Sequence, residues 1–159
     1  MTNAGFTNGT VFNSLAFNFI AGLDVPTTGS MVLYLQNTTA TTNAKSTTWS
    51  TTITGMTTVY SGSVTLPSTA GQFTIPFSSN FTYTGGGIYV AFDYQNASGA
   101  LPATYSTIPS NTSLASGTKC YCSTTINSTT LSGGDVSATS SHRPVTIFGK
   151  PVACARPTN

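Results

Sequence analysis

The stretch that decides the fold reads VFNSLAFNFI and covers residues 11–20. Its large apolar side chains recur at every second position and share one face, with Asn13 at the edge of that face: Leu15, Phe17 and Phe19. The opposite face carries smaller or polar side chains: Ser14, Ala16 and Asn18. A period of two is typical of a strand that buries one face and leaves the other in water. These residues therefore predict a half-buried β-strand.

Eight further stretches have the composition of strands and are separated by turn residues. Residues 31–35 are apolar on both faces and predict a central strand. The other seven are residues 56–66, kinked near residues 61–62; 72–77, with Pro76 at a strand end or edge; 81–83; 88–94, the most apolar; 103–108; 118–123; and 145–148. Residues 37–52, rich in Thr, Asn and Ser around Trp49, predict a long loop. The pattern shows no helical period and predicts an all-β fold, an antiparallel β-sandwich of jelly-roll type with eight or nine strands.

The composition supports the same fold class. Charged residues make up 5% of the 159 residues, against roughly 25% in an average soluble domain. Glu is absent, while Thr and Ser number 32 and 20. This excludes a helical bundle, whose exposed positions favour Glu and Lys, and an apolar fraction of 38% excludes a solvated disordered chain. We expect one domain over residues 1–150, followed by a linker-like, proline-containing exit over residues 151–159.

The charged residues are few and scattered, with a net charge of +2, which bears on nucleic-acid binding and on the location of the protein. Nucleic-acid binding requires clustered cations, but the five cations are scattered: Lys45, Lys119, Arg143, Lys150 and Arg156. No apolar stretch approaches the roughly 20 residues that span a bilayer, so we predict no transmembrane segment. A surface of low charge that is rich in hydroxyl groups favours an extracellular or cell-surface location.

Three cysteines leave the disulfide pairing open. Cys120 and Cys122 flank one residue on a predicted strand, so their side chains point to opposite faces and do not pair with each other. The favoured disulfide joins Cys154 to one of these two. An odd count also permits a free thiol, or a bond completed by another segment.

Catalytic and metal sites find little support in the sequence. Calcium takes six to eight oxygen ligands, usually from several carboxylates, and only Asp24, Asp93 and Asp135 are present as weak candidates. They form no Asp-x-Asp-x-Asp cluster. Glycoside hydrolysis needs two carboxylates at the scissile bond, and a Ser-His-Asp triad would depend on His142 without a Gly-x-Ser-x-Gly motif. We therefore predict a protein that is not an enzyme and needs no cofactor.

Aromatic side chains are the candidates for ligand binding. Trp49 is the only tryptophan and lies in the hydroxyl-rich loop, where it either plugs one end of the core or offers a platform on which a sugar ring stacks. Of these two readings the core is favoured, because large aromatic residues dominate core burial. Tyr105 and Tyr121, on late polar stretches, are weaker candidates.

The chain as a whole resembles the jelly-roll modules of secreted Bacteroidota surface proteins, the cleaved-adhesin-like domains. The matching features span residues 6–150: residues 31–35 with the Thr-rich loop and Trp49, then residues 59–62, 73–77, 81–90 and 142–144. Residues 154–158, Cys-Ala-Arg-Pro-Thr, resemble the opening of a fibronectin type III-like module. The resemblance implies an exported module for adhesion or substrate attachment, and often bound calcium.

Three functional hypotheses follow from these observations. The first is a non-enzymatic extracellular module used for adhesion or for the structural assembly of a cell-surface protein. The second is a carbohydrate-binding module of a secreted hydrolase, with Trp49 as its platform. The third is a subunit of an extracellular filament, joined through exposed sheet edges or an unpaired cysteine. The expected partner is accordingly a glycan or protein on a surface, a neighbouring module, or another copy of the chain.

Overall fold

The computed structural model describes most of the N-terminal two thirds of the chain and part of the remainder. The described residues are 5–21, 27–97, 110–111, 117–120, 136 and 138–152. They form ten strands and one short helix: β1 (Val11–Phe19), β2 (Thr27–Thr38), α1 (Trp49–Ile53), β3 (Thr57–Leu66), β4 (Gly71–Thr82), β5 (Gly87–Asn96), β6 (Ser110–Asn111), β7 (Thr118–Cys120), β8 (Ala138–Ser140), β9 (Arg143–Pro144) and β10 (Ile147–Gly149). β6 and β9 have only two residues each, which leaves eight longer strands. The predicted all-β class is confirmed.

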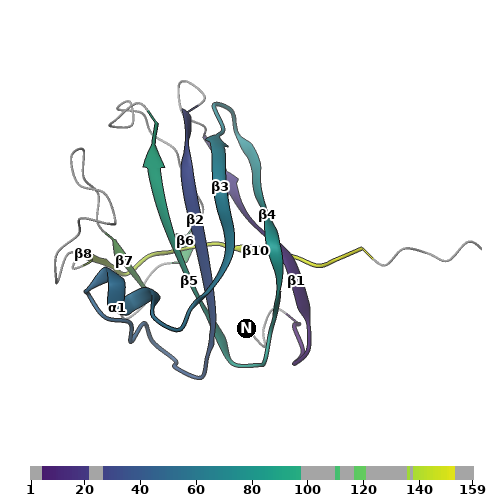
Figure 1. Ribbon diagram of the computed structural model, residues 1–159, viewed down its shortest axis with the longest axis vertical. Coiled ribbons are helices and arrows are strands. Elements are labelled where there is room, and N and C mark those ends of the chain that lie inside the picture. The colour runs from purple at the N-terminus through teal and green to yellow at the C-terminus, as the bar shows by residue number, and fades with distance from the viewer. Residues whose placement is uncertain are drawn as a thin grey trace, which may run out of the picture.

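Two three-stranded antiparallel sheets make up the body of the molecule. One has the order β10-β1-β4 and the other the order β3-β2-β5 (Figure 1). β3 and β4 follow each other in the chain and lie next to each other, so they join the two sheets along one side (Figure 1). Two small ladders, β6-β9 and β7-β8, complete the described strands. The arrangement is an antiparallel β-sandwich.

The alternation predicted for β1 is confirmed, since its buried side chains include Leu15, Phe17 and Phe19. Phe12, only three residues before Leu15, is fully buried as well. The register of β1 against β4 shifts between Phe12 and Ser14. An irregularity of this kind reverses which face the following residues present, so Phe12 and Leu15 reach the same core.

β2 is the central strand that the sequence predicts. It pairs with β3 on one side and with β5 on the other. Met31, Leu33 and Leu35 are buried, while Val32 and Tyr34 on the other face are half-buried. β2 therefore supplies the core on its inner face and meets a second covering layer on its outer face.

The core lies between the two sheets and consists almost entirely of aliphatic and aromatic side chains. Its buried members come from both sheets and from the segment after β4: Phe12, Leu15, Phe17, Phe19, Met31, Leu33, Leu35, Val59, Val64, Ile75, Phe81, Tyr83 and Phe148. Phe148 of the short strand β10 packs its ring 4.8 Å from that of Phe12. The C-terminal strand thus contributes a core residue even though it pairs with β1 over only three positions.

Two predicted details of the strands can be compared with the structure, and the second is confirmed. The kink expected near residues 61–62 is wrong, because the register of β3 against β2 is regular there and shifts instead at the bulged residue Val59. Pro76, expected at a strand end or edge, lies in β4, an edge strand of its sheet, where its missing N–H is tolerated.

The segment predicted to be a long loop contains the helix α1. The Thr52 N–H donates to the Thr48 carbonyl over 2.9 Å, and the Thr52 hydroxyl donates to the Ser46 carbonyl over 2.6 Å. A helix of five residues spans little more than one turn, which is too short for a 3.6-residue apolar period to be visible in the sequence. Among the described residues no helix is long and apolar enough to cross a membrane.

Residues 83–86 carry the chain from β4 in one sheet to β5 in the other. Asn37, near the end of β2, holds this crossing in place: its Nδ2 donates to the Thr82 carbonyl over 2.9 Å, and its Oδ1 accepts from the Thr84 N–H over 3.1 Å. The buried Tyr83 hydroxyl donates to the Gly86 carbonyl over 2.7 Å. One asparagine side chain thus connects the central strand of one sheet to the edge strand of the other.

Candidate functional site

The outer face of the β3-β2-β5 sheet carries the most varied side-chain chemistry among the described residues. Part of this face is covered by the loop of residues 39–48, by α1 and by the β7-β8 ladder. Figure 1 shows α1, β7 and β8 on the β5 side of this sheet. The segment 39–48 leaves β2 at its C-terminal end and then lies back over the sheet.

Trp49 and Tyr34 form the aromatic part of this covering layer. Their ring centroids lie 6.0 Å apart and their planes are nearly perpendicular, at 78°, which is the edge-to-face geometry that aromatic pairs favour. Both side chains are half-buried. Burial, and secondly the negative charge of Asp93, raise the pKa of Tyr34 above its usual value of 10.0. Trp49 therefore packs on the outside of the sheet and is not part of the sandwich core.

Tyr89 of β5 fixes the loop to the sheet. Its hydroxyl donates to the Thr42 carbonyl over 3.2 Å and accepts from the Ala44 N–H over 3.3 Å. The Lys45 ammonium lies 5.3 Å from the centre of the Tyr89 ring, within the range of a cation–π interaction. Tyr34 and Tyr89 come from adjacent strands and share the outer face, so one sheet orients both rings.

The β7-β8 region adds a second cation and a second point of attachment. Lys119 Nζ donates to the backbone carbonyl of Lys45, although the two residues are 74 positions apart in the chain. The Val136 N–H donates to the Thr47 carbonyl over 2.8 Å, and the Val136 side chain is buried. The loop is thus held both by β5 below it and by residues from late in the chain.

We call these five residues the aromatic–lysine cluster: Tyr34, Lys45, Trp49, Tyr89 and Lys119. All five are half-buried. Asp93 is the only acidic residue in the described part of the chain, and its negative charge acts on the Tyr34 hydroxyl. The cluster therefore combines two positive charges with three aromatic rings on an anchored surface.

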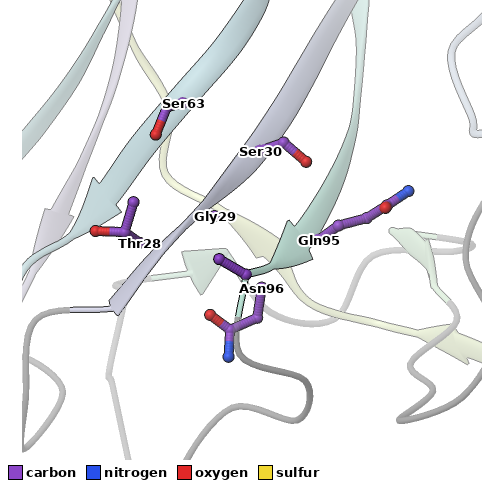
Figure 2. A pocket seen from close by; sticks show the side chains of 7 residues that line it. Thr28, Gly29, Ser30, Ser63, Gln95 and Asn96 are labelled. Atoms are coloured by element: carbon purple, nitrogen blue, oxygen red, sulfur yellow. The ribbon is translucent and has the colours of Figure 1, made fainter.

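Two shallow hollows lie at opposite ends of the same sheet. The first, of about 350 Å³, is shown in Figure 2 and is lined by small hydroxyl residues, amides and backbone: Thr28, Gly29, Ser30, Ser63, Gln95, Asn96 and Ala97. The second, of about 490 Å³, lies at the crossing from β4 to β5: Asn37, Thr38, Thr39, Thr84, Gly85 and Gly86. Neither hollow is lined by a charged side chain.

The metal candidates are not brought together within the described residues. Asp93 lies half-buried on the outer face of β5, and Gln95 Nε2 donates to its Oδ2 at 3.5 Å. Asp24 and Asp135 lie outside the described residues, as do Tyr105 and Tyr121. Where the structure describes the chain, no group of three or more His, Cys, Asp or Glu side chains gathers at one place.

Cys120 at the end of β7 is exposed and carries a free thiol. The predicted disulfide is therefore not formed through Cys120. Cys122 and Cys154 lie outside the described residues, so a pairing between these two stays a prediction.

Sequence reasoning identified Trp49 but not the residues that surround it. Lys45 and Lys119 read as isolated cations because they are far apart in the chain, and only the folding of β7 against the loop brings them together. Tyr34 and Tyr89 lie on strands that the sequence does predict. The signal that could have found them is the alternation of β2 and β5, which places both on the face opposite the core.

Comparison of the chain with protein-family models, with curated proteins and with solved structures finds no match.

Proposed function

We propose that this chain is a non-enzymatic extracellular module that attaches its parent protein to a surface, through adhesion or structural assembly. The low charge and the high content of hydroxyl residues support the extracellular location. The β-sandwich supplies a rigid support of the kind on which recognition surfaces are commonly built.

The observation that carries the proposal is the anchored loop with the aromatic–lysine cluster. Hydrogen bonds hold the backbone of the loop at several points. Its partners are the Tyr89 hydroxyl, Lys119 Nζ and the Val136 N–H. A surface ordered in advance loses little conformational entropy when it binds. Trp and Tyr side chains are also among those that contribute most per residue in recognition surfaces.

Two measurements test this proposal. Intact cells of the source organism, treated with a protease that does not enter them, should lose the protein while cytosolic markers persist. Beads coated with the purified chain should be retained on a layer of extracellular matrix or cell-surface material, and beads coated with heat-unfolded chain should not. A chain protected inside intact cells, or equal retention of both kinds of bead, would contradict the proposal.

A carbohydrate-binding module is the second candidate, and the position of Trp49 favours it. The ring is half-buried outside the core and is held edge-to-face against Tyr34. A panel of polysaccharides would be tested against the wild type and Trp49→Ala, with unfolding temperatures recorded for both. Binding by the wild type that is lost in a folded Trp49→Ala protein supports this function, whereas binding unchanged in the variant excludes Trp49 as the platform.

A further inference from the structure

Two ammonium groups meet at the edge of the anchored loop. Lys119 Nζ reaches the backbone carbonyl of Lys45, and the Lys45 side chain extends from the same residue over the Tyr89 ring. The Lys119 ammonium thus lies within hydrogen-bond distance of the Lys45 backbone, and the Lys45 ammonium lies no farther from that backbone than the length of its own side chain. Two of only five cations in the whole chain gather at this one point.

The described contacts of the two lysines are with uncharged groups. Lys45 Nζ lies over the Tyr89 ring, and Lys119 Nζ donates to a backbone carbonyl. Like charges held close together repel, and partial burial weakens the screening by water. An anion placed between the two ammonium groups would remove the repulsion and form charge-assisted hydrogen bonds with both.

The surroundings of the lysines indicate what kind of molecule carries the anion. Trp49 lies four residues after Lys45 and presents a half-buried indole, and Tyr89 lies under the Lys45 ammonium. Aromatic faces combined with hydroxyl and carbonyl groups suit the C–H faces and hydroxyls of a sugar ring. We propose that the aromatic–lysine cluster binds an acidic saccharide, with a carboxylate or sulfate between Lys45 and Lys119 and a sugar ring against Trp49. This inference rests on the proposed attachment function and names its ligand class.

The test uses isothermal titration calorimetry of the whole chain with polygalacturonate as the acidic saccharide and dextran as the neutral one. We expect the wild type to bind polygalacturonate and not dextran, with an affinity that falls as salt is raised. Lys45→Gln and Lys119→Gln should each weaken binding about tenfold, as expected for the loss of a hydrogen bond to a charged group. Lys45→Arg should retain most of the affinity because it keeps the charge.

Lys150→Gln is the matched control. It removes the same charge from an exposed position after β10, which belongs to the other sheet. Unfolding temperatures for every variant separate a loss of binding from a loss of folding. If a glutamine variant is unstable, Lys45→Arg still tests whether binding depends on the positive charge at position 45.

Several results would overturn the inference. These are the absence of polygalacturonate binding, equal weakening by Lys150→Gln, dextran binding of similar strength, and poly-L-glutamate binding as tightly as polygalacturonate. The last result would assign the site to acidic proteins. If coated beads are still retained on surface material while the chain fails to bind polygalacturonate, this inference fails and the proposed attachment function stands.

Discussion

Replacing Asn37 with alanine tests whether its side chain joins the two sheets. The substitution removes both hydrogen bonds of the amide, the one donated to the Thr82 carbonyl over 2.9 Å and the one accepted from the Thr84 N–H over 3.1 Å. Each such bond contributes about 0.5–1.5 kcal/mol net, so the free energy of unfolding should fall by about 1–3 kcal/mol. Because Asn37 is half-buried and water reaches the vacated groups, we expect the lower half of this range.

The measurement is thermal and urea unfolding followed by circular dichroism. For a domain of this size a change of 1 kcal/mol shifts the unfolding temperature by roughly 2–4 °C, so a loss of about 1–2 kcal/mol in Asn37→Ala should lower it by roughly 2–8 °C. Asn80→Ala is the matched control, because Asn80 is exposed on the edge strand β4 and should change the unfolding temperature by less than about 2 °C. Equal effects of the two substitutions would refute the role assigned to Asn37.

Three further predictions concern the core, the crossing and the response to alkali. Leu33→Ala, at a position with no exposed surface in the central strand, should lower the free energy of unfolding by about 2–5 kcal/mol in urea titrations, and a loss below 1 kcal/mol would contradict the assigned core. Gly86→Ala should be destabilising by more than about 1 kcal/mol, because φ is 74° there and a Cβ would collide with the Thr38 carbonyl oxygen; an unchanged midpoint would refute this geometry. The raised pKa of Tyr34 means that the folded state holds this proton more tightly than the unfolded state, so the stability is complete below pH 10 and falls as the pH rises through the folded-state pKa. Tyr34→Phe should reduce that alkaline fall in stability, and an identical fall in the variant would contradict the assignment.

Much of the fold could be predicted because strand formation is a local property. The alternation around Leu15 and the doubly apolar residues 31–35 identify a half-buried strand and a central strand without reference to the rest of the chain. The position of Pro76 on an edge strand follows from its missing N–H. The bulge at Val59 could not be predicted from the sequence, because a bulge depends on how two strands pair and not on the composition of one of them.

The exposure of β5 also escaped prediction. Residues 88–94 are the most apolar of the predicted strands, yet β5 lies at the edge of the described β3-β2-β5 sheet, and Phe92 is 49% exposed. The Phe92 ring still lies 6.4 Å from that of Phe17 in the opposite sheet, so it reaches the edge of the core. Whether an apolar strand is central or at an edge depends on the order of strands, which hydrophobicity alone does not encode.

The sequence by itself determined the fold class, the main strands and the scarcity of charge, because these depend on side-chain period and composition. Only the tertiary structure decided where Trp49 lies: outside the core, with its ring against Tyr34 on the outer face of the β3-β2-β5 sheet. It also brought Lys119 to Lys45 across 74 positions of chain. The physical reason is that a strand records its own period locally, whereas a surface is assembled from loops whose contacts are set only when the sheets have packed.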